Sequence, residues 1–485
     1  MAIAKDLVVL FMVFVGIPAL AALFCFWRPS RKIGFFLLVF LSVYNNHLSL
    51  NLVSREWYRG SSRGFEFSIL DILAAGLLCA MFLRPARGSR KWYWPAGFIP
   101  MALYFFVCVC SALFSNPKLF AMFEVLKVFR GILIFLTAAM FIQSERELRV
   151  LVWAVASIVC WEGFLALKMR YIGHDYRVQA TFDHPNSLSM FMVLSAPILY
   201  ASAVSNWSAM LRLASFIGVG LACAAVILTV SRSGVFTIGT VIMLAVIACF
   251  SFRLNPQNIF ITVTVLVALA FGIAFSWKTL SQRFNSMENE YTDKGGAMNR
   301  GSYLKLAGLI RHDHFFGIGL NNWSYAVSET YGPMIGLPYK AYYGTDEPPD
   351  DTVDSDMVDP TGTSLDDAQA PPAHNLGALT LGEIGIPGLV VFGIVWLRWL
   401  QMGAVFLLNR PPDPLRRIGL GIFFGTIAVA FQSWTEWEYR QAPIMLYFHL
   451  MLGTLAGLYM MRRDDIRWAR RERNRREDAA QAPAA

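Results

Sequence analysis

Four polar clusters lie between long apolar runs of this chain, and their arginines and one histidine could carry chemistry on a phosphate-containing molecule. Arginine binds phosphate through a planar, forked set of N–H donors and stays charged at any working pH. Histidine is the natural general base for a hydroxyl group near neutral pH. The sequence therefore predicts an anion site with a base beside it, formed by Arg177, Arg232, Arg300 and His374.

The histidine belongs to the cluster PPAHNLGALTLGEIGIPG, where His374 and Asn375 open a short apolar stretch. The spacing predicts a short helix over 374–384 that Gly385 ends, before a membrane span begins. Glu383 follows His374 by nine residues, about 180° around a helix, so we expect the two side chains to point apart. The alternative interpretation of this histidine is a purely structural role.

Two further clusters carry single arginines. RVQATFDHPNSLSMF begins at Arg177, and Pro185 with Asn186 opens a helix there, whose free N–H groups favour an anion. A simple loop with a helix cap is the alternative. TVSRSGVF is a tight turn that leaves Arg232 at the membrane surface, where it either snorkels or pairs with an anion.

The cluster NRGSYLKLAGLIRHDHFFGIGLNNW predicts a helix over 298–311, on which Arg300 and Arg311 lie. Its apolar residues recur at helical spacing: Tyr303, Leu304, Ala307 and Ile310. His312, Asp313 and His314 follow it and suggest metal ligands. Ligands two residues apart do not share a helix face, and no second cluster has suitable spacing. The sequence therefore predicts no metal site and no cofactor.

One predicted span carries charges inside the apolar part. Glu124, Lys127 and Arg130 are three residues apart in turn and share roughly one helix face, so Glu124 can pair with Lys127. A charge at this depth should face protein or a polar cavity. Structural pairing is one interpretation of Lys127 and Arg130. The other is that they bind substrate, as Asn186 and Asn375 are also candidates to do.

The composition places these clusters in a membrane protein. Of 485 residues, 56% are hydrophobic and only 15% charged, and the mean hydropathy is +0.48. A soluble globular protein carries about a quarter charged residues. All seven cysteines lie in apolar runs without metal or disulfide spacing, so we expect them to behave as small hydrophobic residues.

The apolar runs predict an all-α, polytopic bundle of twelve or thirteen spans, because a span needs about 20 apolar residues. The weakest candidate is 33–53, which contains three asparagines and a histidine. The candidates are 7–27, 33–53, 66–84, 94–115, 119–142, 148–168, 187–204, 212–230, 235–252, 258–276, 386–408, 417–435 and 443–461.

Basic residues assign the orientation, since cytoplasmic loops are enriched in lysine and arginine. Eight arginines follow the last run, which predicts a cytoplasmic tail that contacts anionic lipids rather than nucleic acid. The predicted parts are a bundle over 1–276, a large outer loop with short helices over 277–385, C-terminal spans with their connections over 386–461, and the tail over 462–485. Nine acidic residues between Asp346 and Asp367 predict a solvated segment of that loop.

Together the motifs resemble the O-antigen ligase family of bacterial membrane glycosyltransferases, which includes O-antigen-type polymerases. The resemblance covers about 177–392 and rests on the order of four motifs: the arginine with TFDHPNSLS, SRSG, the arginine helix with LIRHDHFFGIGLNNW, and AHNLGALTLGEIGIPGLVVF. Phe315 stands where the family has a proline. The resemblance implies that Arg232 and Arg300 bind the undecaprenyl-pyrophosphate of the donor, that Arg177 supports this site, and that His374 activates the acceptor.

The resemblance thus implies a metal-independent glycan transfer onto a hydroxyl of lipid A-core or another acceptor, at the periplasmic face of the bacterial inner membrane. A polymerase that joins repeat units on the lipid carrier would use the same donor. A transporter of lipid-linked sugars is the alternative from another class. It predicts charges that line a path to both faces, together with internal repeats, which the sequence does not show.

Overall fold

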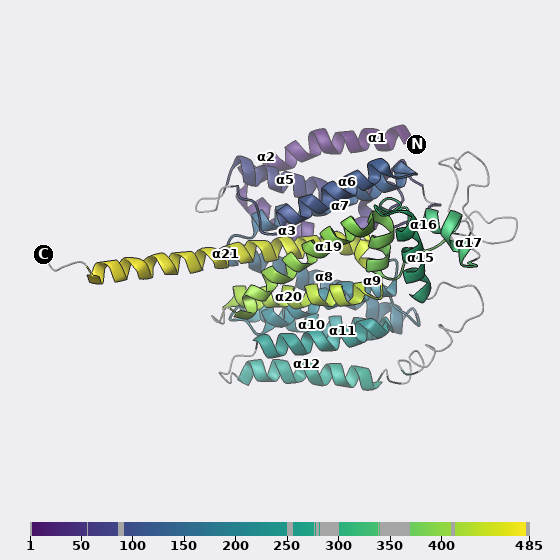
Figure 1. Ribbon diagram of the computed structural model, residues 1–485. Helices are drawn as coiled ribbons and strands as arrows, with labels where there is room; N and C mark the ends of the chain where they lie inside the picture. Colours follow the sequence, from purple (N-terminus) through teal and green to yellow (C-terminus); the bar gives the residue numbers. More distant parts are fainter. Residues whose placement is uncertain are drawn as a thin grey trace.

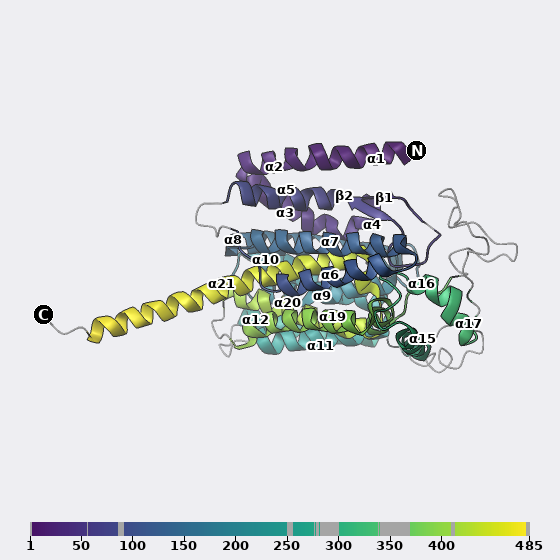
Figure 2. The same cartoon turned by 45° about the horizontal axis from the view of Figure 1, so that its top comes forward.

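A computed structural model describes residues 2–55, 57–85, 92–249, 256–275, 277, 281, 300–337, 339, 369–408 and 413–481, and the acidic stretch 346–367 lies outside them. The described chain is built mostly from helices that run side by side (Figures 1 and 2). The bundle helices are α1 (Ala2–Phe11) and α2 (Ile17–Phe26), joined by η1 (Met12–Gly16), then α3 (Arg28–Leu41), α5 (Ile69–Leu83), α6 (Phe98–Phe114), α7 (Lys118–Phe141), α8 (Glu145–Tyr171), α9 (Pro185–Ala203), α10 (Ala209–Leu228), α11 (Arg232–Cys249), α12 (Pro256–Phe275), α19 (Leu376–Leu408), α20 (Pro414–Ser433) and α21 (Ala442–Gln481).

The two ends of the bundle differ. The tail end is where α21 projects beyond the other helices, and the loop end is the opposite one, where α15, α16 and α17 lie (Figure 1). Strands β1 and β2 form an antiparallel pair in which Ser49 faces Ser68. The short elements are η2 (Ser42–Tyr44), α4 (Asn45–Leu48), β1 (Ser49–Leu52), β2 (Phe65–Ser68), α15 (Arg300–Asp313), α16 (Trp323–Ala326), η3 (Val327–Tyr331), α17 (Gly332–Met334) and η4 (Glu438–Arg440).

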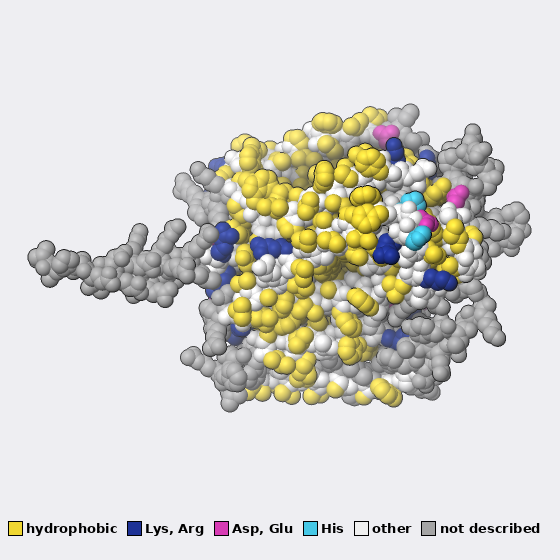
Figure 3. Space-filling model, viewed as in Figure 1, with side chains coloured by type: hydrophobic (Ala, Val, Ile, Leu, Met, Phe, Trp, Pro, Cys, Tyr) yellow, Lys and Arg dark blue, Asp and Glu magenta, His cyan; other side chains and the backbone are white. Residues whose placement is uncertain are grey.

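The bundle has the composition and length of a membrane domain. Eight helices of the described chain are long and apolar enough to cross a bilayer. In Figure 3 a broad hydrophobic band separates two ends that carry lysine and arginine, and in this view histidine gathers only at the loop end. Each of the thirteen predicted runs contains a bundle helix, so the prediction of an all-α, multi-pass membrane protein is confirmed.

The predicted span 33–53 was wrong in its second half. Helix α3 ends at Leu41, and the chain continues through η2, α4 and β1. The asparagines of this stretch find partners at the loop end: Asn45 accepts a hydrogen bond from Arg130, and Asn46 donates one to Asp183. Such partners stabilise irregular backbone where protein or water, rather than lipid, surrounds it.

Close contacts at glycines decide which helices are neighbours. A Cβ on Gly421 of α20 would lie 2.7 Å from Cα of Ile198 in α9, and one on Gly453 of α21 would lie 2.3 Å from the carbonyl oxygen of Phe135 in α7. Small residues let membrane helices approach in this way. Because α20 packs on α9 and α21 packs on α7, their connection, residues 434–441, lies among the helix ends of the loop end.

Candidate active site

The first part of α19 is a short helix that lies ahead of the membrane-crossing part. Asn375 caps it, because its Oδ1 accepts a hydrogen bond from the N–H of Ala378 at 2.8 Å. The helix breaks at Gly385, which has φ 66° and ψ −169°. The predicted short helix that ends at this glycine is thus confirmed, and His374 stands immediately before its cap.

The break at Gly385 is stabilised by the turn that follows α15. The N–H groups of Ile318 and Gly319 donate to the carbonyls of Gly382 and Glu383 at 3.0 and 2.8 Å. These carbonyls belong to the last turn before the break and need such partners. A Cβ on Gly385 would lie 2.2 Å from the carbonyl oxygen of Phe315. The GIG and GEIG stretches therefore pack backbone against backbone, and together they set the position of the short helix.

His374 has a carboxylate partner that the sequence did not reveal. Its Nδ1 lies 2.9 Å from Oε2 of Glu436, in the connection between α20 and α21. The His374 side chain is 34% exposed and that of Glu436 only 9%, so the ring is reachable while its partner is shielded. A carboxylate at Nδ1 favours the tautomer with the proton on Nδ1 and leaves Nε2 as the basic nitrogen. Tyr303 of α15 lies beside the ring, with centroids 6.0 Å apart.

The same connection is anchored by a buried ion-pair network. Arg440 donates from Nε to Glu124 at 2.8 Å and from Nη2 to Glu383 at 2.9 Å. Lys127 Nζ lies 2.6 Å from the other oxygen of Glu124. Two acidic and two basic side chains, each less than 5% exposed, therefore offset one another. As expected, Glu383 does not face His374. Its carboxylate binds Arg440, which lies in the same connection between α20 and α21 as Glu436.

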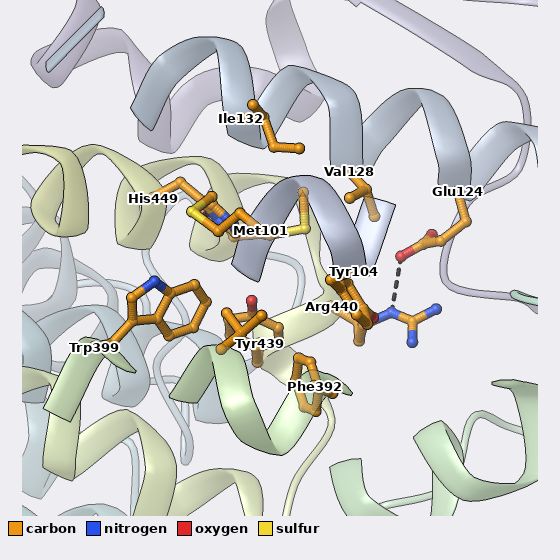
Figure 4. Close-up of a pocket in the computed structure, with 12 residues that line it drawn as sticks. Met101, Tyr104, Glu124, Val128, Ile132, Phe392, Trp399, Tyr439, Arg440 and His449 are labelled. Carbon is orange, nitrogen blue, oxygen red and sulfur yellow. Dashed lines mark hydrogen bonds and ion pairs between the residues drawn. The ribbon is translucent and has the colours of Figure 1, made fainter. Parts of the chain in front are cut away.

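This network separates the loop end from the apolar interior. Glu124 and Arg440 form one side of a small cavity (Figure 4). The rest of its lining comes from α6, α7, α19, η4 and α21, and it is apolar or aromatic apart from a buried histidine: Met101, Tyr104, Val128, Ile132, Phe392, Val395, Trp399, Tyr439, Met445 and His449.

A second histidine and a second glutamate adjoin the His374 pair. Nδ1 of His184, the residue that caps α9, lies 3.6 Å from Oε1 of Glu438. Burial raises the pKa of Glu438 well above its usual range, and Glu436 raises it further. Burial also lowers the pKa of His184, and the charge of Arg177 adds to this effect. Both groups are therefore favoured in their neutral forms.

Arg177 and Asn186 come together at the start of α9. Arg177 donates from Nη2 to Oδ1 of Asn186 at 3.3 Å and from Nε to the carbonyl of Thr229 at 3.1 Å. Arg232 begins α11, and Gly234 in the same turn packs against Ser189 of α9, where a Cβ would lie 2.0 Å from Oγ. The starts of α9 and α11 are therefore adjacent, with two half-buried arginines at the loop end.

Arg300 is the first residue of α15, and its side chain lies outside the described part of the structure. Tyr303, one helical turn later, lies beside His374. Helix α15 packs into a small hydrophobic cluster at the loop end through Tyr303, Leu306, Ala307 and Ile310. The predicted helical spacing of its apolar residues is confirmed except at Leu304, which is exposed, whereas Leu306 is buried. The start of α15 therefore lies close to the histidine.

Arg130 belongs to a different buried network. It donates to Asp71 at 2.8 Å, to Glu66 at 3.2 Å and to Asn45 at 2.6 Å. These partners lie on α5, β2 and α4, so the guanidinium joins α7 to the irregular stretch after α3. The geometry supports the structural interpretation for Arg130, and the pair with Glu124 supports it for Lys127.

Two groups of side chains resemble metal ligands. His312 is 86% exposed, and its Nδ1 lies 3.0 Å from the carboxylate of its neighbour Asp313. By contrast, His374, Glu436 and Glu438 offer one ligand atom each, all within 4.8 Å of one another. Within the described chain, this second group is the one whose geometry could hold an ion.

Glu436, Glu438 and Arg440 were not identified from the sequence. They alternate in the stretch EWEYR, between two spans that are otherwise apolar. Charged and aromatic residues alternate here in a short connection at the membrane interface, and this pattern was the signal that could have identified them.

Comparison with known protein families gives a match over part of the chain. Residues 217–393 match a family model described as O-antigen ligase. The matched stretch includes Arg232, Arg300 and His374, whereas Arg177, Asn186 and the 434–441 connection lie outside it. No curated protein matches the chain.

Proposed function

The chain belongs to the O-antigen ligase family through residues 217–393, and on this premise we propose that it transfers a glycan from an undecaprenyl-pyrophosphate-linked donor to an acceptor hydroxyl. A role of ligase or polymerase type in surface polysaccharide biosynthesis follows from the family itself. The observation that carries the finer proposal is the 2.9 Å contact between Glu436 and His374, on a ring that remains partly exposed at the loop end.

In the proposed reaction His374 Nε2 accepts the proton of the acceptor hydroxyl. The hydroxyl oxygen attacks the anomeric carbon, the bond from that carbon to the phosphate oxygen breaks, and undecaprenyl pyrophosphate leaves with the bonding electrons. Glu436 holds the ring in the basic tautomer and stabilises the imidazolium that forms. It acts through His374 and is a positioning residue.

The leaving pyrophosphate gains negative charge, and arginines at fixed positions are suited to stabilise it. We assign this role to Arg232 and Arg300, with Arg177 in support. The starts of α9 and α11 add free backbone N–H groups at the loop end. Because arginine supplies the positive charge, the proposed reaction needs no metal ion.

The proposed orientation places the loop end in the periplasm of a bacterium, with the protein in the inner membrane. The arginine-rich end of α21 projects from the opposite end of the bundle (Figure 1). This arrangement agrees with the enrichment of basic residues on the cytoplasmic side. Both lipid-linked substrates could then meet His374 at the depth of the membrane interface.

The test uses the purified full chain in nanodiscs with an undecaprenyl-pyrophosphate glycan, with and without lipid A-core, and separates the products by gel. A single shifted product that needs the acceptor indicates a ligase, and a ladder from donor alone indicates a polymerase. His374→Ala should abolish either product while donor binding persists, and His314→Ala, at an exposed histidine, should not. Normal transfer by His374→Ala would refute the assignment of the base, and an unconsumed donor would favour the transporter.

A further inference from the structure

Two carboxyl groups and an imidazole meet at the loop end in an arrangement that the transfer reaction does not fully use. The ligand atoms of His374, Glu436 and Glu438 lie within 4.8 Å of one another. Both glutamates are buried, Glu438 almost completely, with 1% of the residue exposed. Oε2 of Glu438 is buried and has no hydrogen-bond partner in the described structure. Buried polar atoms are rarely left in this way, and each exception calls for a ligand or another explanation.

From this geometry we propose that His374, Glu436 and Glu438 bind a first-row divalent metal ion such as Zn²⁺, and that the bound ion inhibits the protein. One imidazole nitrogen and two carboxylate oxygens form a ligand set that zinc accepts, with solvent in a fourth position. Ligand atoms around one zinc ion lie about 3.5 Å apart. The three side chains therefore need only small movements to close on it.

The protein around the group supports an ion there. Glu438 lies in η4, which Arg440 fixes through its contacts with Glu124 and Glu383. His184 borders the group on one side, with Nδ1 3.6 Å from Oε1 of Glu438, and its Nδ1 accepts the N–H of Asn186 at the start of α9. The two carboxyl groups are thus held close together before an ion arrives, and Glu438 releases its proton when the ion binds.

Inhibition follows from the nitrogen that the ion would occupy. Nδ1 of His374 faces Glu436, so an ion between them takes the place of the shared proton. A neutral imidazole has one proton, so when Nδ1 binds the ion this proton moves to Nε2, which can then no longer accept the proton of an acceptor hydroxyl. This consequence rests on the proposed role of His374 as the base, whereas binding of the ion does not.

Isothermal titration calorimetry with Zn²⁺ tests the binding, on the full chain in detergent, stripped of metal and purified through a tag without histidines. The background variant is His312→Ala/His314→Ala, which removes two exposed histidines that lie close together in the chain and could bind zinc at the surface. We expect it to bind one Zn²⁺ per chain. Adding Glu438→Gln or His374→Ala should weaken binding at least about tenfold. A matched change at an exposed glutamate, Glu329→Gln, should leave binding unchanged.

Two outcomes of the titration would overturn the site. One is that the background variant binds no stoichiometric Zn²⁺. The other is that neither Glu438→Gln nor His374→Ala, each added to the background variant, weakens its binding. The transfer assay is run separately, with and without one equivalent of Zn²⁺. Binding with undiminished transfer would overturn the inhibition and question His374 as the base. Absence of transfer under all conditions would count against the proposed function and leave the titration result standing.

Discussion

Glu436 Oε2 lies 2.9 Å from Nδ1 of His374 although 62 residues separate them in the chain. The contact joins the start of the short helix of α19 to the connection between α20 and α21. The same connection binds the other end of this helix, because Arg440 pairs with Glu383. The element that presents the histidine is therefore held at both of its ends.

The first prediction concerns this contact. Glu436→Gln keeps the shape of the side chain and removes the charge that orients the ring, so the turnover number should fall about a hundredfold. The dissociation constant of the donor should not change, because the pyrophosphate site is formed by other residues. Single-turnover assays and donor binding separate the two quantities. Glu329→Gln provides the exposed control, and a change in donor affinity with normal turnover would contradict the assigned role.

The second prediction concerns the donor site. Arg300→Ala removes a charged donor of hydrogen bonds to phosphate, which is worth about 1.5–3 kcal/mol, so donor affinity should fall at least tenfold. Arg311→Ala lies on the same helix at an exposed position and should leave affinity unchanged. Binding of a fluorescent undecaprenyl-pyrophosphate analogue measures both. Equal affinities for the two variants would remove Arg300 from the site.

The third prediction concerns the buried ion pairs. Arg440→Met removes the ion-pair partner of Glu383 and leaves Glu124 with Lys127 alone, and loss of one member of a buried pair destabilises a protein by about 3–5 kcal/mol. Arg149→Met disrupts an exposed pair with Glu145, 45% and 41% accessible, and should cost less than about 1 kcal/mol. Thermal unfolding in detergent compares the two variants. Similar unfolding temperatures would show that the network contributes little to stability.

The fourth prediction concerns the break in α19. Gly385→Ala places a Cβ 2.2 Å from the carbonyl oxygen of Phe315, at a positive φ that disfavours alanine. We expect a loss of at least about 1–3 kcal/mol and reduced transfer, because the helix that carries His374 must move. Gly393→Ala is the matched control on the same helix, since a Cβ there would meet no atom within 4 Å. Wild-type stability and transfer for Gly385→Ala would contradict the structural role of this glycine.

Several features of the protein followed from the sequence alone. Long apolar runs specify membrane helices because lipid leaves backbone groups no other partners, so the all-α, multi-pass bundle could be predicted. The short helix that ends at Gly385 and the helix that begins at Pro185 followed from local capping signals. The pairing of Glu124 with Lys127 followed from their spacing within one helix. These are contacts within an element, and short stretches of sequence determine them.

The partners that cross between elements depended on the tertiary structure. Glu436, Glu438 and Arg440 meet His374, His184 and Glu383 only because α20 packs on α9 and α21 packs on α7, through glycines that allow close approach. Likewise, the partners of Arg130 come from a stretch that looked like part of a span. A long apolar helix can pack against many others, and hydropathy does not distinguish among them. The three-dimensional packing therefore decides which charges become neighbours, and with them the surroundings of the histidine.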